Sequence, residues 1–461
     1  MSRRIPVWTV CLLAIFWVVG TVGFGMFVHD MENGKRRLGP VTPVVQDLVR
    51  MHETLRKAWR EFRDPAQALT VSEDRFTTRT GFRYSYPAGT DADAPYLLLN
   101  RYDGDDLRSV SELVDLASRE IVARWEYDVD PIWKASAFKS RTWDLKRQFR
   151  TSRFAGIHAL LTRDGKIVVN GMNTPLLAFG PCGKLLWEQD AAAFHHSIET
   201  DEQKNIWVPA HVEPKTLPIG GPGFLQDTVT KLSPDGKIVF SKAVVDILAE
   251  NGLGYLVYGH GFAQDDPVHL NDIEPVRTDG AIWRKGDVFL SLRNRSLVLL
   301  YRPATGKILW SRAGDDAWIH QHDVAILDDH KITVFDNRSP LRQEQRLETD
   351  GVNRLVRVDV RTGAATPVYP EAFRKLDLRT GQQGRGLLLP DGKVVVEETD
   401  FGRVLQFDRN GDEDWSFVNR ATNGRVYLLN WSRIVPRELG DAALTAIGAA
   451  RCGDKQGQQS G

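Results

Sequence analysis

The chain has 461 residues, and its 60 Lys plus Arg balance 60 Asp plus Glu, so the formal net charge is zero. With 42% hydrophobic residues it is typical of a folded domain with a sizeable core, and it offers no basic surface for a nucleic-acid partner. The three cysteines, Cys11, Cys182 and Cys452, lack the Cys-x-x-Cys spacing of zinc and redox sites. At most one disulfide is expected, between Cys182 and Cys452.

An uncharged, apolar run extends from Ile5 to Val28. At roughly 1.5 Å per residue it is long enough to cross a hydrocarbon core of about 30 Å, so we expect residues 1–30 to form a single-pass membrane anchor. A cleaved signal peptide is the alternative, but the run exceeds the usual signal-peptide core and no Ala-x-Ala site follows it. Arg3 and Arg4 precede the run and Lys35, Arg36 and Arg37 follow it, so the charges discriminate little between the two orientations. The four-residue tail before the run favours an inside amino terminus with everything after Val28 outside.

Residues 31–94 are expected to form a helical stalk or linker. Thr42 and Pro43 have the pattern of an N-cap followed by a first-turn proline, and Asp64-Pro65 closes the segment. Between them, apolar residues recur at steps of three and four: Val45, Leu48, Met51, Leu55, Trp59 and Phe62. The pattern predicts one short amphipathic helix without catalytic residues.

From residue 95 to residue 436, short apolar runs alternate with turn sequences. A hairpin of two such runs recurs six times, and its copies end at Trp125, Trp187, Phe240, Trp310, Val368 and Trp415. A second strand pair precedes most copies, so each repeat has about four strands. Radial repetition of such units predicts an all-β fold, a six-bladed β-propeller over 95–436, followed by a tail at 437–461. A solenoid is the alternative, but its period is usually shorter.

Histidines recur where the innermost strand of a repeat begins. His158, His196 and His322 occupy this position, and His269 lies two residues before Asn271 at the matching point of another repeat. A single histidine would most often be an ordinary hydrogen-bonded residue, but the inner strands of a propeller line one central channel. The repetition therefore predicts that these imidazoles surround a common cavity.

Other polar residues near these histidines favour an anion site. His269 and Asn271 stand at i and i+2 and therefore on the same face of a strand. Arg293 ends a further apolar run, where its guanidinium can bind an oxyanion. Imidazoles, an amide and a guanidinium around one pocket can stabilise a small tetrahedral anion while one histidine attacks as the nucleophile.

Five strings, in this order over successive repeats, resemble the bacterial arylsulfotransferases, also called aryl-sulfate sulfotransferases. They are Phe194-His195-His196, His269-Leu-Asn271-Asp-Ile, Ser291-Leu-Arg293-Asn294-Arg-Ser296, Gln321-His322-Asp323 and Phe335-Asp336-Asn337. The resemblance covers residues 150–420 and implies a six-bladed propeller that moves a sulfuryl group from one phenol to another without nucleotide sulfate. It also implies a periplasmic location, which with the expected anchor places the propeller on the periplasmic side of the inner membrane.

The resemblance also implies roles for single residues. The implied catalytic residues are His322, His269, Arg293 and His196, and the implied substrate-binding residues are Asn271, His195 and Asn294. His322 would be sulfurylated in a ping-pong reaction, and His196 would take the proton of the acceptor. The implied partners are a small aromatic sulfate donor and a phenolic acceptor, and no cofactor or metal is expected. The motifs depart from the family pattern at Leu292 and Arg295, which replace a Ser and a Gln, and no cysteine pair flanks His322.

The residues leave two other functions open. A metal-dependent hydrolase would use His320 and His322 as ligands, with His269 as the third. A non-catalytic, membrane-tethered propeller would serve as a platform for protein partners. Of the remaining polar residues, we expect His29, His52 and His330 to face solvent, His211 and His260 to lie in inter-strand loops, and Asp323 and Glu199 to orient imidazoles or cap turns.

Overall fold

The computed structural model describes residues 6–32, 59, 63–140, 142–213, 224–259, 265–314, 317–340 and 348–450. The chain divides into two compact units, Met1–Gln67 and Ala68–Gly461. Residues 68–94, which the sequence analysis assigned to the linker, therefore belong to the second unit. The amphipathic helix expected near residues 42–64 lies almost entirely outside the described residues.

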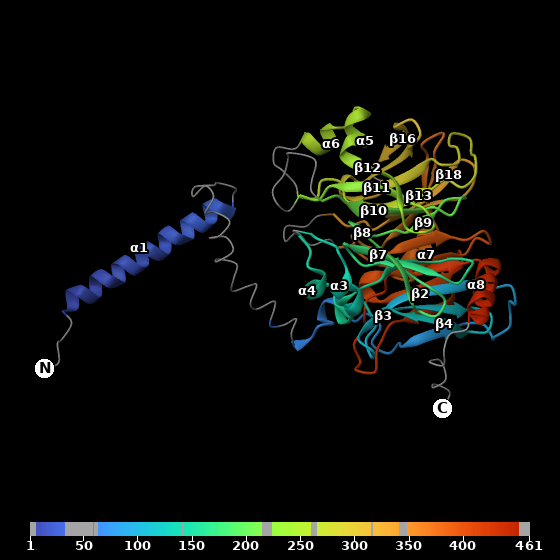
Figure 1. Ribbon diagram of the computed structural model, residues 1–461, viewed down its shortest axis with the longest axis horizontal. Coiled ribbons are helices and arrows are strands. Elements are labelled where there is room, and N and C mark those ends of the chain that lie inside the picture. The colour runs from blue at the N-terminus through green and yellow to red at the C-terminus, as the bar shows by residue number, and fades with distance from the viewer. Residues whose placement is uncertain are drawn as a thin grey trace. The chain divides into compact units, whose positions relative to one another are not determined.

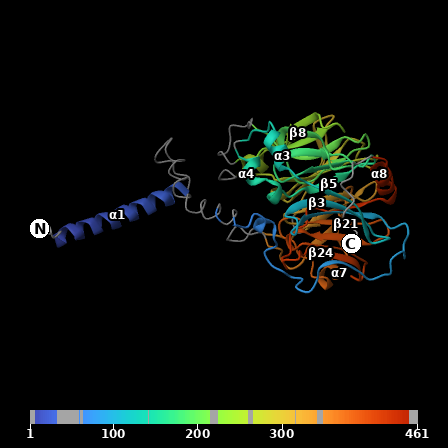
Figure 2. The same cartoon turned by 60° about the horizontal axis from the view of Figure 1, so that its bottom comes forward.

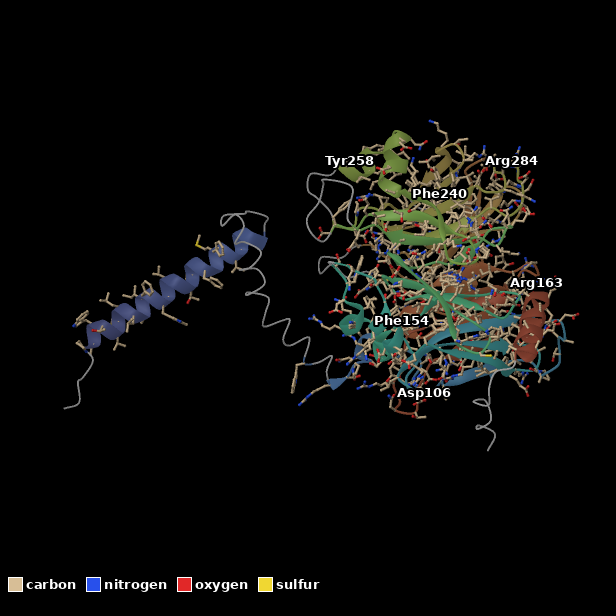
Figure 3. The ribbon with its side chains drawn as sticks, viewed as in Figure 1. Asp106, Phe154, Arg163, Phe240, Tyr258 and Arg284 are labelled. Carbon is tan, nitrogen blue, oxygen red and sulfur yellow. The ribbon has the colours of Figure 1, made fainter. Side chains whose placement is uncertain are left out.

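Helix α1 (Val7–Glu32) is the described secondary structure of the first unit. Its segment Val7–His29 has a mean hydropathy of 2.3, and its side chains stand out all along the helix without burial in the protein (Figure 3). Length and composition fit either a membrane anchor or a signal sequence.

The second unit is built almost entirely from strands, which form five antiparallel sheets (Figure 1). Three are four-stranded: β25 (Arg433–Val435), β2 (Tyr96–Asp103), β3 (Arg108–Asp115) and β4 (Glu120–Glu126); β13 (Leu270–Pro275), β14 (Val288–Leu292), β15 (Leu297–Arg302) and β16 (Lys307–Ala313); and β17 (His322–Ile326), β18 (Lys331–Asp336), β19 (Arg354–Asp359) and β20 (Ala365–Val368). A fourth sheet has β21 (Arg385–Leu388), β22 (Val394–Glu398), β23 (Arg403–Phe407) and β24 (Glu413–Val418), with β1 (Gly81–Tyr84) added at its edge.

The fifth sheet has eight strands. They are β5 (Ile157–Leu161), β6 (Ile167–Asn170), β7 (Thr174–Phe179), β8 (Leu185–Phe194), β9 (Glu199–Thr200), β10 (Ile206–His211), β11 (Asp227–Leu232) and β12 (Ile238–Ala243). The sheet is continuous because β8 pairs with β10, Phe194 opposite Ala210. The all-β, propeller-like fold is thus confirmed with four separate blades, and the eight-stranded sheet takes the place where two further blades were expected.

Short helices and 3-10 turns connect the strands. The helices are α3 (Asp130–Ala135), α4 (Leu145–Gln148), α5 (Val244–Glu250), α6 (Tyr255–Tyr258), α7 (Pro370–Lys375) and α8 (Arg437–Ala449), and the 3-10 turns are η2 (Gln67–Leu69), η3 (Thr151–Arg153), η4 (Arg293–Arg295) and η5 (Thr399–Phe401). The expected tail at 437–461 therefore begins with a helix, α8. Cys182 is disulfide-bonded and Cys11 is free, while Cys452, the expected partner, lies outside the described residues.

Both ends of the second unit are fixed to the sheets. Strand β25 pairs with β2, so the last strand of the chain completes the sheet that the first long strand begins. Figure 2 shows the blue strand β3 of this sheet between the green β5 and the orange β21. Helix α8 packs beside the same sheet, where Tyr96 donates a hydrogen bond to Asp441, and Figure 3 shows Arg163 next to this helix, in agreement with its ion pair to Glu438.

Apolar clusters between neighbouring sheets hold the strands in place. Tyr127, Trp133 and Phe154 are buried in one cluster, and Trp283 and Trp318 in another. Because burying one large apolar side chain contributes roughly 1.5–3 kcal/mol, these clusters fix the positions of the inner strands.

Glu397 on β22 holds the residues just before β25. Its carboxylate accepts hydrogen bonds from the main-chain amides of Trp431 (2.7 Å) and Ser432 (2.6 Å) in a fully buried setting. We predict that Glu397→Ala lowers the free energy of unfolding by about 2–6 kcal/mol, because two buried amides lose their acceptor. Urea unfolding measures this, with Glu371→Ala at an exposed helical position as the control. Equal stability of the two variants would contradict this role of Glu397.

Candidate active site

A left-handed backbone residue recurs where the inner strands begin. These residues are His158 (φ 48°), His196 (φ 57°), His269 (φ 52°), Asp323 (φ 50°), Gly384 (φ 110°) and Trp431 (φ 61°). Histidine and aspartate tolerate this conformation better than most residues, and β-branched residues avoid it. The repeated backbone geometry therefore turns side chains from different sheets in the same way.

The predicted imidazoles come together around one tryptophan. The ring centroid of His196 lies 4.9 Å from that of His269 and 6.3 Å from that of His322. Trp431 lies against His196 (5.7 Å) and His322 (5.9 Å). Three histidines from three different sheets thus form one cluster, as the sequence predicted; we call His196, His269, His322 and Arg293 the axial cup.

His322 has one ring nitrogen engaged and the other free. Its Nδ1 lies 2.8 Å from Oδ1 of Asn337, whose own amide nitrogen donates to the carbonyls of Thr380 (2.9 Å) and Gln383 (2.7 Å). Because Asn337 presents only its oxygen, the proton of neutral His322 is held on Nδ1. The Nε2 atom is buried without a hydrogen-bond partner. Burial and the nearby Arg293 cation hold the pKa of His322 well below its usual value.

The segment that carries His322 is fixed by side chains on the neighbouring sheet. Gln321 donates from Nε2 to Oγ of Ser291 (3.0 Å), and Asn271 donates from Nδ2 to the carbonyl of Gln321 (2.8 Å). Asn271 is completely buried, so it supports the main chain just before His322. Its amide nitrogen is bound to this main-chain carbonyl, and the substrate-binding role expected for Asn271 stays a prediction.

His269 forms a pair with Asp266, a residue that the sequence analysis did not select. The His269 Nδ1 contacts Oδ2 of Asp266, and both side chains are about a quarter exposed, 23% and 26%. Asn294 donates to the Asp266 carbonyl (2.8 Å) and accepts from Arg293 (3.1 Å). The sequence signal for this pair is the aspartate three residues before a repeat-position histidine. The signal is weak, because many turns carry an aspartate.

Arg293 is the cation of the axial cup. Its side chain is largely buried, its Nε has no hydrogen-bond partner, and its main-chain amide donates to the carbonyl of His269 (3.0 Å). Burial lowers the pKa of Arg293, since a charged guanidinium is poorly solvated there. Its charge also lowers the pKa values of His196 and His322, in addition to the effect of their burial. The guanidinium therefore lies close enough to these imidazoles for its charge to act on both of them.

His195 lies next to His196, with its ring in contact with the His196 ring. Their Nδ1 atoms are 2.7 Å apart, and the His195 ring stacks on that of His211 at 4.1 Å. The expectation of an inter-strand loop for His211 is wrong, because the residue ends strand β10 and is buried. A histidine at a strand end far from any repeat position gave no sequence signal. His260 and His52 lie outside the described residues.

His158 also lies against Trp431, at 5.7 Å between ring centroids, but its two nitrogens contact other polar groups. Its Nδ1 accepts a hydrogen bond from the Ile198 amide (3.0 Å), and its Nε2 contacts Arg385 and lies 3.5 Å from Glu199. Asp323 binds Arg385. Glu199 thus lies next to the imidazole of His158, in line with the expectation that it orients an imidazole and does not merely cap a turn. Asp323 pairs with the guanidinium of Arg385 instead.

A cavity of about 800 Å³ lies along the inner strands, and the imidazoles of the axial cup do not line it. Its lining includes Glu199, Glu274, Arg277 and Arg433 together with apolar residues farther along the inner strands. The axial cup is identified by its converging side chains and not by cavity size.

His320 does not converge with His322 and His269 in a metal-ligand set. Its Nδ1 donates to the Ser339 carbonyl (2.5 Å). Within the described parts of the chain, the groups whose ligand atoms do converge are His195, His211 and Asp227, all buried, and the more exposed Asp328, Asp329 and His330.

The fold is thus a propeller-like assembly of sheets whose strand ends bring three imidazoles together, with Arg293 nearby. The Arylsulfotransferase (ASST) family model matches residues 158–420, more than half of the 461 residues, and the chain belongs to this family. The resemblance noted in the sequence is thereby confirmed, and membership supports an arylsulfotransferase-type function. None of the curated proteins compared with the chain matches it.

Solved structures with a similar fold have little sequence in common with this chain. They include a protein of unknown function from Bacteroides caccae (12% identity, TM-score 0.46, covering 74% of this chain and 99% of that one) and a nidogen/laminin complex (9%, 0.41, 74% and 98%). TolB from Acinetobacter baumannii is a third (11%, 0.41, 74% and 66%). At these identities nothing about function follows from them.

The lowered pKa of His322 has a spectroscopic consequence. A histidine in an unfolded chain gains its second proton near about pH 6.5, whereas His322 is expected to stay neutral at pH 5.5, with its proton on Nδ1. We predict that its imidazole nitrogen signals, observed by NMR with labelled histidine and assigned by their loss in His322→Gln, keep the pattern of this tautomer from pH 8 to pH 5.5. Protonation between pH 7 and pH 6 would contradict the assignment.

Proposed function

We propose that the protein is an aryl-sulfate sulfotransferase that works without nucleotide sulfate, by a ping-pong reaction through a sulfohistidine at His322. The observation that carries the proposal is the free, buried Nε2 of His322 beside Arg293 and His196. A neutral imidazole whose other nitrogen is held by Asn337 has its lone pair available for attack. The substrates are a small aromatic sulfate donor and a phenolic acceptor.

In the first half-reaction the Nε2 lone pair of His322 forms an N–S bond with the sulfur of the aryl sulfate. The bond between sulfur and the aryl oxygen breaks, and the phenolate leaves with the electron pair. The positive charge on the ring is stabilised through the Nδ1–H bond to Asn337, which strengthens as the imidazole becomes cationic. Arg293 and His196 bind the sulfuryl oxygens, where negative charge must be held in a buried site.

In the second half-reaction an acceptor phenol loses its proton and attacks the sulfur. The S–N bond breaks, and its electron pair returns to Nε2 of His322. We assign the base to His269, because the Asp266 carboxylate holds the ring proton on Nδ1 and leaves the lone pair on Nε2. This replaces the earlier expectation that His196 is the base. Partial exposure of His269 and Asp266 also lets a proton exchange with solvent.

We further propose the six-bladed form of the fold, with β5–β8 and β9–β12 as two blades joined at the β8–β10 pairing. The six left-handed positions at the starts of the inner strands support this count. We propose that residues 1–30 form an uncleaved single-pass anchor in the inner membrane, with the propeller on the periplasmic side and a linker between them. Apolar length in α1 and the basic residues before it support this arrangement.

The proposal is tested with purified protein, 4-nitrophenyl sulfate and phenol. We expect release of nitrophenol that depends on phenol. With donor alone, one sulfuryl group should be found by mass spectrometry on the peptide that contains His322. His322→Ala should abolish both signals, while His330→Ala, in the turn between β17 and β18 and outside the axial cup, retains them. Folded wild-type protein with neither turnover nor adduct would contradict the proposal and favour the non-catalytic platform.

Asp266→Asn separates the two half-reactions. Nitrophenolate is a good leaving group and needs no proton, so we predict that the burst of nitrophenol from the first half-reaction keeps its rate. Transfer to phenol should slow by about 10²–10⁴-fold, because the base loses the carboxylate that orients it. Stopped-flow measurement of both phases checks this, with Asp265→Asn at the exposed neighbouring position as the matched control. Equal slowing of both phases would contradict the assignment of His269 as the base.

A further inference from the structure

A second group of side chains that could bind a metal ion adjoins the axial cup through the contact between His195 and His196. His195 follows strand β8, His211 ends strand β10, and Asp227 begins strand β11, directly opposite His211 in the antiparallel register. The three side chains are more than nine-tenths buried. Their ligand atoms, Nε2 of His195, Nδ1 of His211 and a carboxylate oxygen of Asp227, lie within 4.8 Å of one another.

These three atoms face one another. The Asp227 Oδ1 forms ion-pair contacts with the His195 Nε2 (3.3 Å) and the His211 Nδ1 (3.0 Å), but none of the three atoms makes an aligned hydrogen bond. Two imidazole nitrogens directed at one buried carboxylate oxygen without such bonds have the arrangement of ligands around a common ion. The contacts are close enough for hydrogen bonds but lack their alignment.

The spacing fits ligands around a common ion. Tetrahedral zinc binds imidazole nitrogen at about 2.0–2.1 Å and carboxylate oxygen at about 2.0–2.2 Å, which places neighbouring ligand atoms roughly 3.3 Å apart. The two measured contacts, 3.0 and 3.3 Å, are close to this value. Two imidazoles and a carboxylate are also a donor set that divalent transition metals prefer.

The rest of each ligand is already fixed. The other Asp227 oxygen, Oδ2, accepts a hydrogen bond from the Leu270 amide (2.8 Å). The His211 ring lies between His195 (4.1 Å) and Trp143 (5.3 Å), with interplanar angles of 20° on both sides. Such supporting contacts are typical of metal ligands, whose orientation is set by the groups around them.

We propose that His195, His211 and Asp227 bind one divalent transition-metal ion, with Zn²⁺ as the best match, and that solvent completes the coordination. The site is separate from the nucleophile: one ring, that of His195, links it to His196 of the axial cup. The metal would be a positioning ion and would not contact the sulfuryl group.

The bound metal would fix which ring nitrogens of His195 and His196 carry a proton. The consequence for the reaction rests on the proposed function. A metal on Nε2 of His195 leaves the ring proton on Nδ1, which then donates to Nδ1 of His196 across 2.7 Å. Neutral His196 must then carry its own proton on Nε2. Its free edge becomes a hydrogen-bond donor suited to a sulfuryl oxygen, in agreement with His269 as the base.

The test uses the full chain, purified in detergent, stripped with a chelator and titrated with Zn²⁺. We expect one zinc per chain by elemental analysis, saturable binding by calorimetry and a higher thermal unfolding temperature with zinc. Asp227→Asn and His211→Gln should weaken binding by more than the about 10–100-fold that outer partners of a metal site contribute. Asp329→Asn, in the exposed group with Asp328 and His330, is the matched control and should bind as the wild type does.

Wild-type protein that takes up no stoichiometric zinc, or Asp227→Asn protein that retains it, would overturn the proposal. Because wild-type protein alone gives the stoichiometry and the thermal shift, the result does not depend on the variants folding. Zinc binding without turnover would refute the sulfotransferase function and leave the metal site standing. Turnover with unchanged rate in protein shown to lack zinc would refute the positioning role of the metal and leave the sulfotransferase function standing.

Discussion

The hydrogen bond between Asn337 and His322 is the interaction on which the rest of the site depends. It places the ring proton on Nδ1, and the amide nitrogen of Asn337 is in turn fixed by two main-chain carbonyls. Burial then keeps the ring neutral. A histidine that is neutral, oriented and free at Nε2 has its lone pair available, and the proposed reaction relies on this property.

The fold supplies this arrangement by repetition. Each inner strand begins with a residue in the left-handed conformation, so side chains from distant parts of the sequence turn toward one axis. Packing between the sheets holds the strands in register, and the pairing of β25 with β2 fixes the last one. The cluster of His196, His269 and Trp431 is therefore a consequence of backbone geometry that one sheet could not produce.

The propeller-like class and the convergence of His196 and His269 were predictable, because hairpin periodicity and histidines at repeat positions are visible in the sequence. His322 joins them from the position just before the left-handed residue Asp323. The contacts of these histidines were not predictable. Asn337 stands in the string Phe335-Asp336-Asn337, but nothing in that string indicates its hydrogen bond to His322. Asp266 and His211 act through turn geometry or through residues distant in the chain, which leave no periodic signal. The linker boundary was misplaced for a similar reason, since β1 joins the sheet only by pairing with β24, more than three hundred residues away.

In the proposed reaction, side chains from separate sheets bind one SO₃ group in line with Nε2 of His322. A crystal structure with a tetrahedral or trigonal-bipyramidal anion, such as orthovanadate, would locate this group. We expect the anion's central atom in front of His322 Nε2, with oxygens on Arg293 and His196. An anion bound in the cavity beside Glu274 and Arg277, or an axial cup that excludes it, would refute the proposed site.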